Sequence, residues 1–321
     1  MSPVTAVVLP FEKPVVELLA RVREVRALSD GSDQYAAELQ ELEEQTAILA
    51  RELLAKLTPI QKVQLSRHAN RPYTLDYVQR LFDDWIELKG DRRFAEDEAL
   101  VAGLARFHGR SVAVVGHQKG RGTKENLRRN FGMAHPEGYR KAIRLYELAE
   151  KFGLPIVTFI DTPGAYPGIG AEERGQSQAI GASIATMARA RVPIVACIVG
   201  EGGSGGALAL GVANRVLVLE LGCYTVITPE GCAAILWKDA EHTAEAAKQL
   251  KITSKDLLRL GVVDEIVAEP PGGAHHDYDW AAANLDKALE QALTELSKLS
   301  GDELADHRYA RFRALGSLGS Q

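Results

Sequence analysis

The sequence predicts an α/β protein whose sheets are covered by helices on both faces. Short apolar runs alternate with segments of helical period through most of the chain. These runs are apolar throughout rather than at every second residue, which is typical of strands buried on both faces. A chain of 321 residues suits one large domain with appendages. We expect an arm over 1–33, a main domain over 34–296 and a tail over 297–321.

Two helices are expected at the N-terminus. The first covers 14–28 and the second 35–57, and each has apolar residues at helical spacing. The polar run 29–33 separates them. They form a helical hairpin that docks on the body or on a partner, and we find no chemistry in it.

The middle of the chain contains the expected strands and helices of the main domain. Two β-rich runs, 100–107 and 111–116, are joined by a tight turn and predict a hairpin. Further strands are expected at 155–160, 192–199, 216–219, 224–227 and 262–267, with helices at 136–152, 171–191, near 229 and at 278–299. The tail beyond Gly301 is expected to be loosely held.

Composition excludes several classes of function. The net charge of -5 gives no reason to expect nucleic-acid binding. No apolar run reaches the roughly 18 residues that span a bilayer, and the first ten residues lack the features of a signal peptide, so we expect a cytoplasmic protein. Three widely spaced cysteines (Cys197, Cys223 and Cys232) without a C-x-x-C pair predict neither disulfides nor a four-cysteine zinc site. No metal site is expected in this chain.

A glycine-rich segment, 200–206, follows a predicted strand and precedes a short predicted helix. Backbone amides at such a junction have no partner within the helix, and the absence of side chains lets a ligand approach them. The segment therefore predicts an anion site or an oxyanion hole, formed by the amides of Gly205 and Gly206. A tight junction with glycines needed only for packing is the plainer interpretation.

Two other interpretations of the same segment remain open. Gly200, Gly202 and Gly205 match the dinucleotide pattern G-x-G-x-x-G, with Glu220 twenty residues later, although few residues remain for the crossover helix. Gly202, Ser204 and Gly206 match the G-x-S-x-G nucleophile turn. Its acid and base would come from Asp239, Asp264, His242, His275 and His276.

Two further loops are candidates for binding. Lys119, Arg121, Lys124, Arg128 and Arg129 crowd one loop and form either an anion site or a solvated face. The loop 161–168, which includes Gly164 and Ala165, follows a strand and forms either a pocket wall or a rigid connection.

Eight runs, in matching order, resemble the alpha subunit of bacterial acetyl-CoA carboxylase carboxyltransferase. The runs are Arg71–Tyr77, Gly116–Gly120, Arg128–Met133, Pro136–Lys141, Phe159–Gly168, Ala171–Ser177, Gly200–Ala207 and Pro229–Cys232. The resemblance covers residues 35–295 and implies a crotonase/ClpP-like ββα spiral with an N-terminal helical hairpin and a C-terminal helix. It also identifies 34–296 as a coenzyme A carboxyltransferase domain.

The same resemblance implies an activity and its partners. A carboxyl group moves from carboxybiotin, carried on a biotin carboxyl carrier protein, to acetyl-CoA, forming malonyl-CoA for fatty acid synthesis. Two alpha and two beta chains assemble, zinc is expected only on the beta subunit, and ATP is used by the partner biotin carboxylase. No membrane or nucleic-acid partner is implied.

The resemblance also assigns site residues. The amides of Gly205 and Gly206 stabilise negative charge on the biotin ureido oxygen, and a second oxyanion hole is expected on the beta chain. From the loops described above, we also expect substrate binding at Gly202, Gly203, Gly164, Ala165, Lys119 and Arg121. A stand-alone crotonase-like hydratase or hydrolase acting on an acyl-CoA, and a non-enzymatic scaffold that assembles through the hairpin, remain the alternatives.

Overall fold

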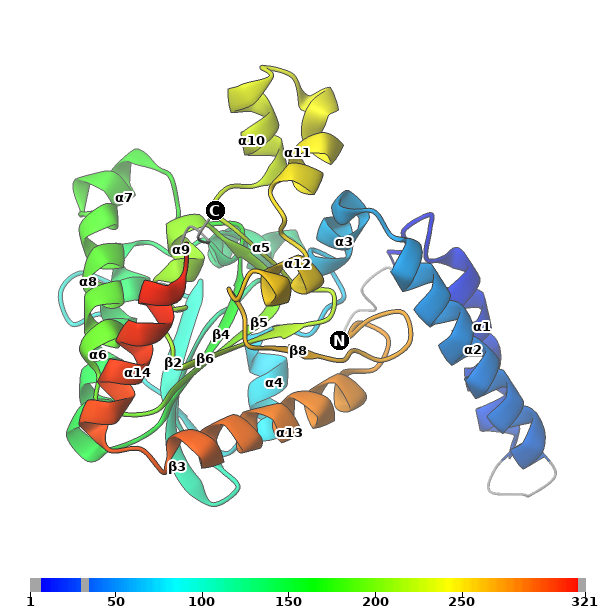
Figure 1. Ribbon diagram of the computed structural model, residues 1–321, viewed down its shortest axis with the longest axis horizontal. Coiled ribbons are helices and arrows are strands. Elements are labelled where there is room, and N and C mark those ends of the chain that lie inside the picture. The colour runs from blue at the N-terminus through cyan, green and yellow to red at the C-terminus, as the bar shows by residue number, and fades with distance from the viewer. Residues whose placement is uncertain (1–6, 30–34, 317–321) are drawn as a thin grey trace.

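The computed structural model describes residues 7–29 and 35–316. A sheet lies at its centre (Figure 1). The sheet has eight strands in the order β1-β2-β3-β4-β5-β6-β8, with β7 paired to the end of β5. The strands are β1 (Asp83–Glu87), β2 (Leu100–Phe107), β3 (Arg110–His117), β4 (Ile156–Thr162), β5 (Ile194–Gly203), β6 (Arg215–Leu219), β7 (Cys223–Thr225) and β8 (Glu265–Val267).

The first three strands are antiparallel, and the strands from β3 to β8 pair in parallel. The predicted hairpin is confirmed, with Leu100 opposite His117 and Phe107 opposite Arg110. Every residue of β4 and β5 is buried, because helices cover both faces of the sheet. The carboxyl ends of these two central strands lie side by side, and the candidate site lies there.

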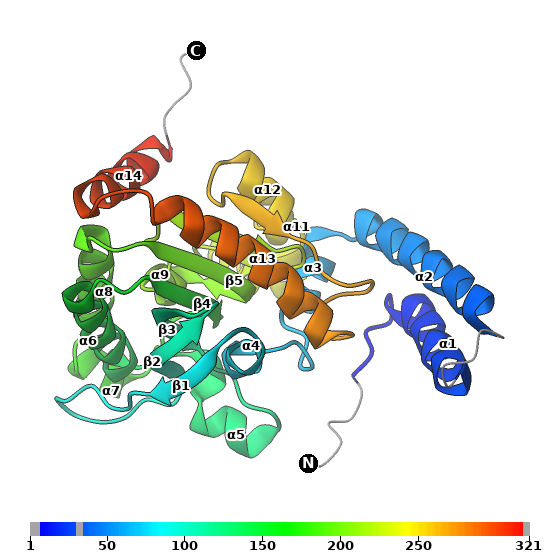
Figure 2. The same cartoon turned by 90° about the horizontal axis from the view of Figure 1, so that it is seen from below.

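Two layers of helices cover the sheet (Figure 2). On one face, α6 (Pro136–Phe152) and α8 (Gln176–Arg189) pack their apolar side chains on the strands. On the other face lie α4 (Thr74–Leu81) and α13 (Tyr278–Leu296). The short helices are α3 (Pro59–Ser66), α5 (Thr123–Arg128), α7 (Ile169–Glu173), α9 (Ser204–Leu208), α10 (Pro229–Leu236), α11 (Thr243–Gln249), α12 (Ser254–Arg259) and the 3-10 turns Asn130–Gly132 and Ala240–His242.

Several elements differ from the prediction. The helix expected over 171–191 is two helices, α7 and α8, because Gly175 between them adopts φ 83°. The expected strand 262–267 shortens to β8, and 224–227 becomes β7. The edge strand β1 and the helices α3 and α4 were not predicted.

The expectation of a loosely held tail was wrong. Helix α14 (Gly301–Ala314) begins at a capping box between Ser300 and Glu303 and packs on the body. Its Arg308 is 1% exposed and donates hydrogen bonds to the side chain of Asn214 and the carbonyl of Ala190. Local charge suggested a solvated segment, whereas these long-range contacts order it. The domain boundaries remain predictions.

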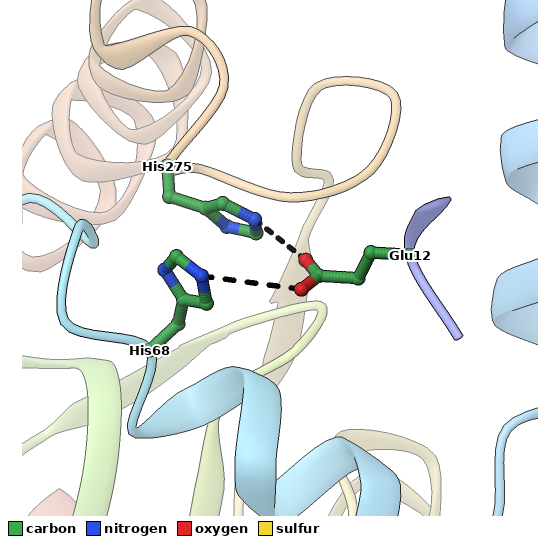
Figure 3. Close-up of side chains that lie close together, drawn as sticks. All are labelled: Glu12, His68 and His275. Atoms are coloured by element: carbon green, nitrogen blue, oxygen red, sulfur yellow. Dashed lines mark hydrogen bonds and ion pairs between the residues drawn. The ribbon is translucent and has the colours of Figure 1, made fainter. Parts of the chain in front are cut away.

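The N-terminal hairpin of α1 (Lys13–Ser29) and α2 (Ala36–Lys56) projects from the body, as Figure 1 shows. A buried junction ties its base down (Figure 3). Glu12 Oε1 lies 2.8 Å from His275 Nε2, and Glu12 Oε2 accepts the Leu9 amide at 2.9 Å. His68 Nε2 lies 3.9 Å from Glu12, and its ring stacks on His275 with centroids 4.1 Å apart.

Within the described ranges 7–29 and 35–316, no helix combines the length and the apolar character that crossing a membrane requires.

Candidate functional site

The amides of Gly205 and Gly206 lie in the first turn of α9, directly after β5. Amides in a first helical turn have no partner within the helix. No hydrogen bond to either amide is found among the residues that the structure describes. Gly205 is partly exposed and Gly206 is buried, so the two donors span the border between the interior and a cavity.

The loop after β4 packs against this turn. A Cβ on Gly206 would lie 2.5 Å from the Ala165 amide nitrogen, and a Cβ on Gly203 would overlap the carbonyl of Pro163. Thr162 Oγ1 donates to the Gly164 carbonyl at 2.6 Å and fixes the start of the loop. The structure therefore brings Gly164 and Ala165 together with Gly205 and Gly206, and close backbone contact explains the glycines.

A cavity of about 340 Å³ opens beside Gly205. Its walls are mainly apolar, and burial raises the pKa of Tyr224, one of its walls, to about 12. The cavity is lined by Ser204, Gly205, Leu208, Tyr224, Thr225, Val226, Leu250, Lys251, Leu257, Leu260 and Val262. The wall residues between 224 and 262 have no local sequence signal as site residues, because only the fold brings them to the glycine turn.

A network of charges, buried at Asp161 and more exposed toward Glu230, connects to the two loops. Lys119 Nζ donates to Asp161 Oδ1 at 2.7 Å and to Glu201 Oε1 at 2.9 Å. Arg67 bonds the other oxygen of Glu201 at 2.7 Å and reaches Glu230 on α10 at 2.8 Å. Burial alone would lower the pKa of Lys119, but the carboxylates of Asp161 and Glu201 raise it above its usual value.

The rest of the basic loop is also largely paired. Arg121 lies 2.6 Å from Asp76 Oδ2 and over the ring of Tyr73, with its guanidinium carbon 4.7 Å from the ring centroid. Arg128 and Arg129 pair with Glu125. Lys124 is exposed and has no ion pair among the described residues. Most of the positive charge expected to hold an anion is thus compensated within the chain.

Gly202 and Gly203 lie in β5, and both are buried. A Cβ on Gly202 would lie 2.7 Å from Tyr224 Cδ2. Their backbones pair with β7, where Gly202 lies opposite Tyr224 and Gly203 opposite Thr225. The structure therefore supplies a packing reason for both glycines, and substrate contact at these positions remains a prediction.

The nucleophile interpretation finds no partner for Ser204. Ser204 is exposed and adopts φ 56°, the strained geometry of such a turn. None of the five candidate acids and histidines contacts it. His275 is bonded to Glu12, Asp264 to Arg311, and His242 stacks on Trp237.

The dinucleotide interpretation also lacks its structural context. Helix α9 has five residues, too few for the crossover helix that would follow such a glycine loop.

One described group has the donor set of a metal site: Glu12, His68 and His275, with ligand atoms within 4.8 Å of one another. The side chains of this group form hydrogen bonds with one another and with the backbone. His68 Nδ1 accepts the Asn70 amide, and His68 Nε2 lies 2.9 Å from the Val7 carbonyl. The three cysteines are free and buried. We therefore describe this cluster as a structural junction.

The fold is similar to that of solved carboxyltransferases. The transcarboxylase 12S subunit matches with a TM-score of 0.59 at 20% identity, covering 71% of this chain and 42% of that one. A Pseudomonas malonate decarboxylase hetero-tetramer matches with a TM-score of 0.56 at 19% identity, covering 69% and 91%. These neighbours confirm the predicted crotonase-like fold.

Sequence comparisons are more specific. Residues 8–316 match the family model described as acetyl co-enzyme A carboxylase carboxyltransferase-like. The acetyl-coenzyme A carboxylase carboxyl transferase subunit alpha of Sorangium cellulosum is 70% identical over 98% of this chain and 99% of its own length. The protein of the same name from Thermus thermophilus is 58% identical over 97% and 98%. This chain therefore belongs to the family of carboxyltransferase alpha subunits of acetyl-CoA carboxylase.

Proposed function

We propose that this chain, together with a beta subunit, transfers the carboxyl group of carboxybiotin to acetyl-CoA and forms malonyl-CoA. Family membership supports carboxyl transfer as the reaction. The observation that carries the chemistry is a pair of unpartnered amides, that of Gly205, which lines an open cavity, and that of the adjacent Gly206. Such donors stabilise oxygen atoms that become negatively charged in the transition state.

The cavity suits the biotin ring. Biotin supplies a carboxyl carrier whose ureido oxygen gains negative charge when the carboxyl group leaves. We propose that the amides of Gly205, which lines the cavity, and of the adjacent Gly206, which is buried, donate to that oxygen, while Leu257 and the other apolar walls of the cavity suit a ring that is otherwise weakly polar. An oxyanion donor of this kind is worth about 3 kcal/mol of activation barrier.

A partner surface is proposed to complete the site. Val226 and Leu260, which line the cavity, are 77% and 54% exposed. Exposed apolar side chains around a cavity mark an interaction surface. We propose that the beta subunit covers it in an assembly of two alpha and two beta chains, carries zinc and supplies the second oxyanion hole.

The remaining partners follow the same proposal. A biotin carboxyl carrier protein delivers carboxybiotin, a biotin carboxylase uses ATP to form it, and the assembly works in the cytoplasm. Within the chain, the backbone at Gly164 and Ala165 is proposed to wall the biotin site. Arg121 remains a candidate for substrate contact. The predicted substrate contact of Lys119 is replaced by a role in holding the two loops, because its side chain is only 12% exposed and its ammonium group bonds Asp161 and Glu201.

The test is reconstitution. The chain alone should be inactive, and adding a beta subunit and carboxybiotin should give malonyl-CoA from acetyl-CoA. Ser204→Ala should retain this activity, whereas Gly206→Leu should abolish it. Turnover of an enoyl-CoA by the chain alone would instead favour the hydratase. Loss of activity in a folded Ser204→Ala variant would restore the nucleophile interpretation.

A further inference from the structure

The side chain of Lys119 connects the starts of the two loops that form the site. Asp161, which accepts Lys119 Nζ at 2.7 Å, lies two residues before Pro163. Glu201, which accepts the same nitrogen at 2.9 Å, lies two residues before Gly203. The backbone amide of Glu201 donates to Asp161 Oδ1 at 3.2 Å, so the three residues form a closed set of bonds.

We propose that Lys119 is a positioning residue for carboxyl transfer. Its ammonium group holds the loop 163–165 against the turn 203–206 and thereby fixes the direction of the Gly205 and Gly206 amides. The inference rests on the proposed function and adds to it a residue that acts through the two loops.

The electrostatics explain why a cation is needed at this point. The side chains of Asp161 and Glu201 are 2% and 12% exposed, so water screens their charges weakly. Two buried carboxylates on one site repel each other unless a cation lies between them. Removing the ammonium group would leave the carboxylates facing each other and would move the two loops apart.

The packing leaves little freedom for compensation. A Cβ on Gly200 would lie 3.1 Å from Asp161 Oδ2 and closer still to the rest of that carboxylate. Arg67 holds Glu201 from the opposite side at 2.7 Å. Glu201 therefore cannot retreat, and the displacement falls on Asp161 and the loop that follows it.

The test compares Lys119→Met with wild type in the reconstituted alpha–beta enzyme. We expect kcat to fall about 100-fold, the effect of an ångström-scale misplacement of catalytic groups. The KM for acetyl-CoA should stay within about threefold, because substrate binding itself is retained. Lys119→Arg keeps the positive charge, and its kcat should be at least about tenfold higher than that of Lys119→Met.

Arg308→Met is the matched control. It also removes a buried cation, but Arg308 binds next to the starts of β5 and β6, at the end of the sheet opposite the site. When Arg308→Met and wild type assemble with the beta subunit to the same extent, their kcat values should be the same. If Lys119→Met does not fold, Glu201→Gln weakens only the bond from Lys119 to the turn 203–206 while keeping the shape of the side chain, and should lower kcat by a smaller factor.

A folded Lys119→Met enzyme with kcat within about threefold of wild type would overturn the inference. A raised KM at unchanged kcat would also overturn it, because Lys119 would then bind substrate directly. Wild-type enzyme that transfers no carboxyl group would refute the proposed function itself, and that assay distinguishes the two failures.

Discussion

Gly206 lies against Ala165 so closely that a Cβ on Gly206 would be 2.5 Å from the Ala165 amide nitrogen. At the neighbouring Gly205, a Cβ would meet only Ile180, at 3.6 Å, which is an ordinary contact. The two glycines of the proposed oxyanion site therefore differ in the side chains that they tolerate.

We predict that Gly206→Ala loses far more activity than Gly205→Ala. The first must push the 163–165 loop away, while the second keeps its amide and fits. Loss of a well-placed oxyanion donor costs about 10²–10³ in kcat. The measurement is malonyl-CoA formation by both variants with a beta subunit, after thermal unfolding has shown that both are folded. Equal loss in the two variants would contradict the packing argument.

The ion pair of Arg71 and Glu269 predicts a large loss of stability. Both side chains are at most 1% exposed, and two bonds of 2.8 Å join them. Arg71→Met leaves the Glu269 charge buried without its partner, which costs about 3–5 kcal/mol. Urea unfolding measures the change. The exposed pair of Arg80 and Asp279 is the control, and Arg80→Met should cost at most about 1 kcal/mol.

Asn214 predicts how firmly α14 is held. Its Oδ1 accepts the Ile194 amide at 3.1 Å, and its Nδ2 donates to the Leu304 carbonyl at 2.8 Å. Asn214→Leu leaves the Ile194 amide and the Leu304 carbonyl without these partners. Each unpaired buried group lowers the free energy of unfolding by about 1–3 kcal/mol. We expect faster hydrogen exchange in α14 than in the wild type. Asn284→Leu, which loses one exposed bond of 3.3 Å, should leave exchange in α14 unchanged.

The base of the N-terminal hairpin should loosen as the pH falls. Burial lowers the pKa of His276 to about 3, with a smaller contribution from His275, and burial also lowers that of His68. The unfolded state, in which histidine has its ordinary pKa near 6.5, therefore binds protons first, and stability falls as the pH drops below that value. Burial acts to raise the pKa of Glu12, but hydrogen bonds from His275 and Leu9 outweigh it, so its contribution is also lost in acid.

Hydrogen exchange in α1 measures this effect. One pH unit below 6.5, a histidine kept neutral by the fold weakens the junction by about tenfold. We expect protection of α1 to fall by that factor between pH 7.5 and 5.5, and His276→Gln to reduce the change. The exposed His108, paired with Asp286 at 2.9 Å, provides the control, and His108→Gln should leave the pH response unaltered. A pH-independent α1 would contradict the prediction.

Elements that have a clear pattern in the local sequence could be predicted from it. The buried strands β4 and β5 begin with largely apolar runs, and the glycines at 200–206 indicated a strand–helix turn, which the structure has at the end of β5. The division of the helix 171–191 was missed, because a glycine at 175 is tolerated in a helix and its positive φ depends on tertiary packing.

The charged network was misjudged for a similar reason. Lys119 was interpreted with its neighbours in sequence as part of a basic loop, but its partners are Asp161 and Glu201, 42 and 82 residues away. Charge patterns along the chain carry no information on such pairing. The cavity walls between 224 and 262 and the ordered α14 likewise depend on contacts that only the closed sheet creates.

The contact between Glu12 and His275 has a consequence for biosynthesis. The two residues are 263 positions apart, so the base of the hairpin cannot close until almost the whole chain has been made. At the usual rate of translation, about 5–20 residues per second, that delay is roughly 13–50 s. During this time Val15, 2% exposed in the finished protein and close to Gly272, lacks the late segment that covers it, so the nascent hairpin exposes apolar surface that a chaperone could cover.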